Sequence, residues 1–299
     1  MGTVVRRAGA SARWLEVGVR FAVLGPLAVS LDDGTAVPIR GGQRRTLLAA
    51  LLLAGGAPVS ADRLADLLWG AGAPPPAGSP LHNQVARLRR ALGDPESVRA
   101  VAPGYLIRLR PGELDLHAFA EHAADGRRAL AEQDWPRAAR RLAAALALWR
   151  GTPLAELPAL AGDVRLRELE EDRLQVLQGR IEADLRLGRH PALLAELREL
   201  AADHPGHSAF HGQLMLALYR SGRRDEALKV FAAFSTGLRV GLGLEPSAEL
   251  SELHARILAE DPALELAPAG PSASAATPAA TVPGNVPRQL PADGRTFTG

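Results

Sequence analysis

The feature that most constrains the fold of this chain is a repeated pattern in its second half. The segment around Gly188, LRLGRHPALLAEL, aligns with the segment around Gly222, LYRSGRRDEALKVF, at a spacing of 34 residues. A repeat of this length with a small residue in its middle is typical of a helical hairpin, and such hairpins bury their apolar faces by stacking on one another. The sequence therefore predicts a stack of helical hairpins.

This helical region is predicted to cover residues 112–261. A weaker third copy, AEQDWPRAARRL around Gln133, lies 55 residues before Gly188, so the array is expected to be irregular. The period of 34 residues is that of tetratricopeptide repeats, which predicts an all-α, tetratricopeptide-like domain; a generic helical bundle is the alternative. Aromatic residues make up only 4% of the chain, so the core is expected to consist mainly of Leu, Ala and Val.

Residues 19–111 show a different order of elements. Strand-like runs occupy residues 19–40, with a tight-turn signal at Asp33-Gly34. Helical patterns follow over residues 43–54, 60–70 and 79–92, and Ser60 is a favourable N-cap for the second. VRAVAPGYLIRLR then indicates a hairpin that turns at Pro103-Gly104. Strands, three helices and a terminal hairpin predict a winged helix-turn-helix, so the fold class is α with a small β part.

Both ends of the chain are predicted to lack a fold of their own. Residues 1–18 are expected to be a flexible N-terminus. No signal peptide is expected, because no apolar stretch follows Arg6 and Arg7. Residues 262–299 contain seven prolines and are rich in Ala, Ser and Thr, which predicts a disordered linker. The longest apolar run, Leu47 to Ala54, is too short to span a bilayer, so no membrane partner is expected.

Charge and composition narrow the function. Residues 1–110 hold 14 Arg against 7 Asp and Glu, whereas residues 111–261 hold 19 Lys and Arg against 24 Asp and Glu. Only the first part is therefore expected to meet a polyanion such as double-stranded DNA. The absence of cysteine excludes disulfides, thiolate zinc sites and a cysteine nucleophile, and it favours a cytoplasmic location.

The third predicted helix carries the sharpest functional signal. Leu81, Val85, Leu88 and Leu92 recur at helical spacing and are expected to form its buried stripe. The opposite face carries Asn83, Arg87 and Arg90, which are the side-chain types that read base edges in the major groove. A solvated face of an amphipathic helix is the alternative interpretation.

Other basic side chains of this part are candidate contacts to DNA phosphates. If Pro103-Gly104 formed a two-residue turn, Arg99 and Arg108 would lie directly opposite each other, and Ala100 and Ala102 would face the core. Two arginines facing outward on a wing would suit a phosphate backbone. The full set of predicted phosphate contacts is Arg44, Arg45, His82, Arg89, Arg99 and Arg108.

No pattern for catalysis, a cofactor or a metal is found. Gly41-Gly42 precedes a helix, but neither GxxxxGK[ST] nor GxGxxG is present. His204, His207 and His211 have suggestive spacing, yet no carboxylate completes a metal site. We therefore predict a protein that is not an enzyme and that has no cofactor and no metal.

Several segments resemble a known family. RTLLAALLLAGGAPVSADRLADLLWG, PLHNQVARLRRALGD and PGYLIRL resemble the OmpR-like winged-helix domain of the Streptomyces antibiotic regulatory protein (SARP) family. HPGHSAFHGQLMLALYRSGRRDEALKVF and LGLEPSAELSELHARIL resemble its bacterial transcriptional activation domain. The resemblance covers residues 19–260, and it is most specific in the last two strings.

The resemblance implies a cytoplasmic, sequence-specific activator of secondary-metabolite (antibiotic) gene clusters. Such a protein is expected to bind direct repeats near the promoter as a head-to-tail dimer and to recruit RNA polymerase. It also implies that Asn83, Arg87 and Arg90 enter the major groove. The loop predicted to approach polymerase or sigma factor consists of Gly70, Ala71, Gly72, Ala73, Pro74, Pro75, Pro76, Ala77 and Gly78.

Two departures from the family pattern leave alternatives open. Many relatives have Tyr-Val-Ser where this chain has Gln84-Val85-Ala86, which puts the base preference in doubt. The tail VPRQLPADGRTFTG resembles the junction to the nucleotide-binding STAND module of the larger, AfsR-like members. The alternatives are a truncated front end of a STAND ATPase regulator and a tetratricopeptide-like adaptor that no longer binds DNA.

Overall fold

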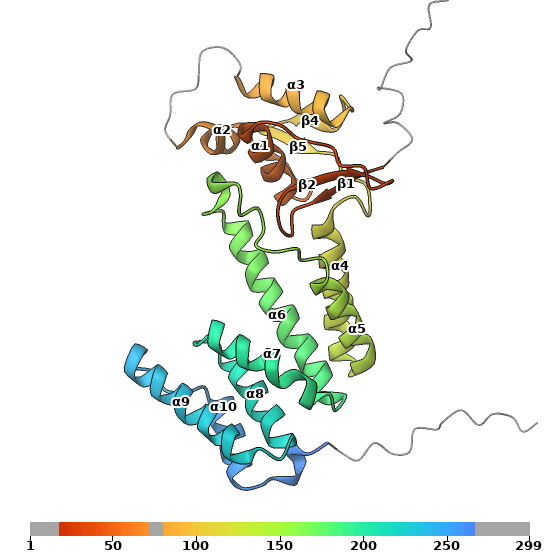
Figure 1. Ribbon diagram of the computed structural model, residues 1–299. Coiled ribbons are helices and arrows are strands. Elements are labelled where there is room, and N and C mark those ends of the chain that lie inside the picture. The colour runs from red at the N-terminus through yellow and green to blue at the C-terminus, as the bar shows by residue number, and fades with distance from the viewer. Residues whose placement is uncertain (1–17, 72–79, 267–299) are drawn as a thin grey trace, which may run out of the picture.

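The N-terminal part of the computed structural model combines three helices with two small antiparallel sheets (Figure 1). The structure describes residues 18–71 and 80–266. Ser60 caps the second helix as predicted, because its side chain accepts a hydrogen bond from the Arg63 N–H at 3.2 Å. The elements of this part are β1 (Val19–Ala22), β2 (Ala28–Leu31), α1 (Gly42–Leu53), β3 (Val59–Ser60), α2 (Ala61–Trp69), α3 (Pro80–Leu92), β4 (Val98–Val101) and β5 (Gly104–Ile107).

Helix α1 is the centre of this part. Every residue from Thr46 to Leu53 is buried. The helix is enclosed because α2 and α3, strand β5 and a segment of the second half all pack against it. A helix that is apolar on all sides fits this central position.

The wing hairpin turns at a different place from the predicted one. Its turn residues are Ala102 and Pro103, not Pro103 and Gly104. Gly104 instead pairs with Ser60 of β3, and a Cβ atom at Gly104 would lie only 2.0 Å from the carbonyl oxygen of Val59. The close approach of β3 therefore requires glycine inside the strand and sets the register of the hairpin.

This register corrects the predicted arginine pair. Arg99 lies opposite Leu106, and the Arg108 N–H donates to the carbonyl of Ser97 at 2.8 Å. Arg99 and Arg108 therefore occupy diagonal positions on the same outward face rather than directly opposite ones. The prediction that Ala100 and Ala102 face the core was also wrong, because both are exposed at the tip of the hairpin.

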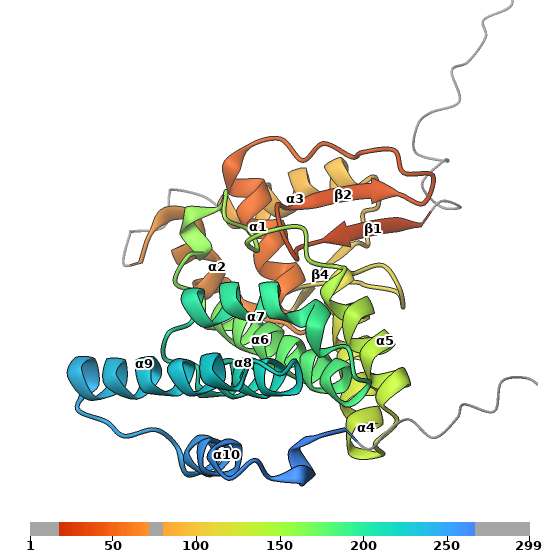
Figure 2. The ribbon, with the colours of Figure 1, turned by 60° about the horizontal axis from the view of Figure 1, so that its bottom comes forward.

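The second half is a stack of antiparallel helical hairpins, which confirms the tetratricopeptide-like prediction (Figure 2). Residues Gly188 and Gly222 lie in the turns between paired helices with left-handed φ angles of 76° and 71°. Gln133 holds the equivalent position in the first hairpin with a φ of 58°. The helices are α4 (Asp115–Ala131), α5 (Trp135–Leu146), α6 (Val164–Arg186), α7 (His190–Asp203), α8 (Ser208–Arg220), α9 (Arg224–Leu242) and α10 (Ala248–Leu258), with 3₁₀ turns η2 (Pro158–Leu160) and η3 (Pro262–Leu264).

The same hydrogen bond closes all three turns. In each, the N–H of the residue after the left-handed position donates to the carbonyl five residues earlier, at 2.8 to 3.0 Å. The first repeat lies 55 residues from the second for two reasons. Residues 147–163 separate α5 from α6, where only residues 204–207 separate α7 from α8, and α6 has 23 residues where α8 has 13. The irregularity therefore comes from a longer connection and a longer helix, not from the loss of a repeat.

The inserted segment joins the two halves. Leu154, Leu157 and Leu160 are 2%, 4% and 0% exposed and belong to the hydrophobic core around α1. A boundary between residues 111 and 112 was predicted from the sequence, but the core of the N-terminal part extends across it. The N-terminal part thus completes its core with leucines that lie 43 to 49 positions beyond residue 111.

Asp115, the first residue of α4, forms a second link. Its carboxylate accepts hydrogen bonds from the backbone N–H groups of Val23 and Leu24 at 2.9 to 3.0 Å. Burial raises the pKa of this carboxyl group, while those N–H groups and Arg150 act in the opposite direction. The interaction ties the start of the helical stack to the loop between β1 and β2.

The first residues of the predicted linker, residues 262–264, form a 3₁₀ turn. Pro262–Leu264 forms η3, Leu264 is 4% exposed, and its carbonyl accepts a hydrogen bond from Arg220 Nε at 2.7 Å. The apolar side chain of Leu264 explains why this stretch packs against the helices despite its proline. Residues 267–299 and 1–17 lie outside the described residues.

Candidate nucleic-acid interface

Helix α3 lies at the outer end of the molecule, opposite to α8, α9 and α10 (Figure 1). Val85, Leu88 and Leu92 are 0%, 0% and 2% exposed, which confirms three members of the predicted buried stripe. Leu81 is half-buried and packs against the same core. The stripe fixes the rotation of α3 about its axis, so the opposite face of the helix points to solvent.

The outward face of α3 carries the predicted base-reading side chains. Asn83, Arg87 and Arg90 are all exposed, and so is His82. Within residues 18–71 and 80–266, no carboxylate lies within ion-pair distance of Arg87 or Arg90. Among the described residues, the one side-chain hydrogen bond of this pair runs from Arg90 Nε to the Ala86 carbonyl in the same helix, at 3.3 Å. Both guanidinium groups therefore retain donors for an external acceptor.

Gln84 faces a neighbouring helix instead of solvent. Its Nε2 donates to Oε1 of Gln43 at 2.8 Å, and Nε2 of Gln43 lies 3.4 Å from the Leu68 carbonyl. This chain of amides connects α3 with α1 and α2. Gln84 thus links the three helices in this chain.

The side chains predicted to contact phosphates differ in whether they already have a partner within the protein. Arg44 and Arg108 have no carboxylate within ion-pair distance in the described part of the chain, whereas Arg99 lies 3.4 Å from Glu96. Nε of Arg89 donates to the Val98 carbonyl at 2.8 Å, and this half-buried side chain fastens α3 to the wing. Arg89 therefore already has a structural role, the connection of α3 to β4.

Arg45 is the most strongly engaged of the set. Its Nη2 lies 2.6 Å from Oε1 of Glu156 in the inserted segment, and the same carboxylate oxygen accepts a hydrogen bond from the Leu27 N–H at 2.8 Å. A second pair joins the halves nearby, between Arg63 of α2 and Asp163 at 3.0 Å. Sequence reasoning missed both acidic partners. The one available signal was the three-residue spacing of leucines in TPLAELPAL, which marks an apolar face in a loop.

Of the predicted polymerase-contact loop, the structure describes only Gly70 and Ala71, and both are exposed. Ala71 follows Gly70, which ends α2 with a φ of 97°. Residues 72–78 of that loop lie outside the described residues.

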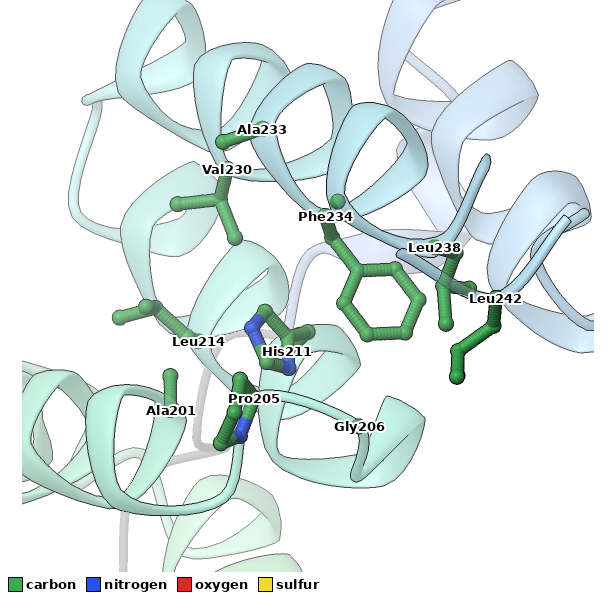
Figure 3. Close-up of a pocket in the computed structure, with 11 residues that line it drawn as sticks. Ala201, Pro205, Gly206, His211, Leu214, Val230, Ala233, Phe234, Leu238 and Leu242 are labelled. Atoms are coloured by element: carbon green, nitrogen blue, oxygen red, sulfur yellow. The ribbon is translucent and has the colours of Figure 1, made fainter. Parts of the chain in front are cut away.

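The helical half contains a cavity of about 460 Å³ between α8, α9 and the turn that precedes α8 (Figure 3). His211 lies in its wall with its ring centre 4.3 Å from that of Phe234, and burial lowers the pKa of His211. His207 stacks on Phe210 at 4.2 Å. These rings pack within the core, and no group of three His, Asp or Glu side chains suited to a metal occurs among the described residues.

The fold and this surface define a class of protein, a winged-helix transcriptional regulator with a helical activator domain. The family model of the bacterial transcriptional activator domain matches residues 114–258. Regulatory protein DnrI of Streptomyces peucetius is 38% identical over 81% of this chain and 93% of its own length. Regulatory protein AfsR of Streptomyces coelicolor is 40% identical over 98% of this chain, but the match spans only 29% of AfsR.

A solved structure agrees with these relatives. Mycobacterium tuberculosis EmbR in complex with a low affinity phosphopeptide matches with a TM-score of 0.78 at 34% identity, over 83% of this chain and 66% of that chain. The chain belongs to the Streptomyces antibiotic regulatory protein family of transcriptional regulators. No helix of the described residues is long and apolar enough to cross a membrane.

Proposed function

We propose that this regulator binds promoter DNA by placing α3 in the major groove and activates transcription of a secondary-metabolite gene cluster. In this proposal Asn83, Arg87 and Arg90 read base edges, since Arg pairs with guanine and Asn with adenine in a bidentate manner. The other arginines of the surface hold phosphates and set the position of the helix.

One observation carries the proposal. The face of α3 opposite Val85 and Leu88 exposes two arginines without a carboxylate partner in the described part of the chain. The buried stripe holds α3 in a fixed orientation, and the two unpaired guanidinium groups on its other face do not stabilise the fold. Their N–H donors are instead positioned to bind a polyanion.

The wing supports the same surface. Arg99 and Arg108 lie on one face of the β4–β5 hairpin, about 7–8 Å apart as diagonal neighbours. Arg44 adds a further half-buried cation at the start of α1. We assign Arg44, Arg99 and Arg108, together with His82, to phosphates. Arg45 and Arg89 are secondary members, because their partners tie them to another element of the protein. The partner of Arg99 is only the exposed Glu96, three residues away in the same segment.

The reading face is tested by Arg87→Ala. Loss of one bidentate contact should weaken binding to the best site by about 1–3 kcal/mol and relax the preference at one base position. Binding is measured at several salt concentrations on the selected site and on a scrambled duplex. Arg140→Ala is the matched control, because Arg140 is exposed on α5 with no charge partner in the described chain. An equal loss on both duplexes would mean that Arg87 only contacts phosphate.

Arg108→Ala tests the wing. It should weaken cognate and scrambled binding to the same extent and reduce the salt slope by about one, since it removes one phosphate contact. A loss confined to the cognate duplex would show that Arg108 reads a base, and the assignment of the wing to phosphates would then fail.

The arrangement on DNA and the contact with polymerase belong to the same proposal. We infer a head-to-tail dimer on direct repeats, assembled through the helical half, and recruitment of RNA polymerase or sigma factor through the loop that begins at Gly70. Selection of bound sites from random DNA tests the first point, because a two-fold palindrome would indicate a symmetric dimer. In vitro transcription with a shortened loop tests the second, and normal activation by that variant would contradict it.

A further inference from the structure

A second cavity of the helical half, of about 380 Å³, lies between α6, α8 and α10. Leucine side chains form its apolar wall, and among them Leu185 and Leu250 are each 3% exposed. Its size falls within the range of small-molecule sites. The charged residues that line it are Glu182, Arg186, Arg220 and Glu249.

Arg220 is held rigidly at this cavity. Its Nε donates to the Leu264 carbonyl at 2.7 Å and its Nη1 to the Leu185 carbonyl at 2.9 Å. Within the described residues it has no carboxylate at ion-pair distance. Burial, and next the charge of nearby Arg186, lower the pKa of Arg220. Its charge is thus fixed in place and not neutralised.

Arg186 lies beside it and is fixed differently. Its guanidinium carbon is 5.3 Å from the ring centre of Trp135, a cation–π contact. It too has no carboxylate at ion-pair distance in residues 18–71 and 80–266. Two other arginines of this region, Arg180 and Arg189, both pair with Asp184, so unpaired arginines are not the rule here.

The two carboxylates of the cavity limit what can bind. Neither Glu182 nor Glu249 forms an ion pair with another described residue. A ligand that carried negative charge along its whole length would be repelled by them. A ligand with one anionic end at the arginines and an uncharged apolar body over the leucines avoids this repulsion.

We propose that this cavity binds a small amphiphilic anion, a carboxylate or phosphate on a short apolar body, with Arg186 and Arg220 holding the head group. Arg220 also holds the Leu264 carbonyl of η3, so an occupant would reinforce the packing of η3 and α10 on α8. The site is therefore suited to an effector that acts on the end of the helical stack. It does not depend on the proposed DNA binding.

The test uses the whole chain and three probes that differ only in the head group: hexanoate, hexanol and hexylamine. Methyl resonances of leucines in the cavity are followed during each titration. Hexanoate should shift them in a saturable manner, and hexanol and hexylamine should bind about tenfold more weakly or worse, because the charge-assisted hydrogen bonds are lost. Hexyl phosphate, titrated in parallel, decides between a carboxylate and a phosphate ligand.

Arg220→Met and Arg186→Met should each weaken hexanoate binding about tenfold. Arg140→Met, an exposed arginine of α5, should leave it unchanged. If Arg220→Met unfolds, Arg186→Met decides, since that side chain is exposed and holds no backbone group. Equal binding of hexanol, tighter binding of hexylamine, wild-type affinity of Arg186→Met, or no shift with any probe would each overturn the proposal.

Discussion

The arginines of α3 and those of the helical stack show how one residue type serves two purposes. Arg87 and Arg90 lie exposed on a rigid helix with no carboxylate partner among the described residues. Arg180 and Arg189 converge on the buried carboxylate of Asp184 at 3.3 and 2.7 Å. Arg180 and Arg189 therefore stabilise contacts within the protein. The charges of Arg87 and Arg90 are left available to an external anion.

The arginines at the junction between the N-terminal part and the helical stack share features of both sets. Arg45 and Arg63 belong to the N-terminal part, yet each pairs with an acidic residue around the inserted segment, Glu156 or Asp163. Both pairs are only partly exposed, and they surround the leucines that complete the N-terminal core. The two regions therefore differ in net charge, but one hydrophobic core extends from the N-terminal part into the second half. The predictions below test this contrast.

The largest effect is expected for Leu160→Ala. Leu160 is fully buried in the core shared with α1, so its truncation should cost about 2–5 kcal/mol of the free energy of unfolding. Because that core supports α3, specific DNA binding should fall at temperatures where the variant begins to unfold. Denaturant unfolding measures the loss, and Leu258→Ala, at a site that is 49% exposed, is the control. A cost below that of the control would mean that the N-terminal part folds independently of the insertion.

A smaller effect is expected for Asp184→Ala in the stack. It leaves two arginines without their shared buried acceptor and should cost about 1.5–3 kcal/mol of stability. Affinity for DNA should stay at the wild-type value, because Asp184 lies near the end of α6 and both of its arginine partners belong to the helical half. Glu121→Ala, an exposed acidic residue of α4, controls for loss of charge. Weaker DNA binding by a folded Asp184→Ala would break the division of roles between the two sets of arginines.

The smallest effect is expected for Glu156→Gln at the junction. Glutamine keeps an acceptor for the Leu27 N–H but removes the charge that holds Arg45. Stability should change by less than about 1 kcal/mol, as is usual for a partly exposed pair. The freed Arg45 should steepen the salt dependence of DNA binding by up to about one unit of slope. An unchanged slope would remove Arg45 from the set of phosphate contacts.

The sequence by itself determined the features that depend on local periodicity. The apolar stripe of α3 fixed which face the helix buries, and Gly188 and Gly222 marked turns that require a left-handed residue. The cap at Ser60 and the class of the fold also followed from short patterns, as did the family. These patterns involve residues that are close together in the sequence. Helix and turn geometry alone therefore determines how such residues are placed relative to one another.

Only the tertiary structure decided which distant groups meet. The register of the wing hairpin depends on the close approach of β3 to Gly104. Gly104 pairs with Ser60, which lies 44 positions earlier in the chain. The partners of Arg45 and Arg63 lie 111 and 100 positions along the chain. Leu160 packs in the core around α1, a helix that ends 107 positions earlier in the chain, at Leu53. No local period encodes such contacts, because packing and charge pairing select partners by their position in space.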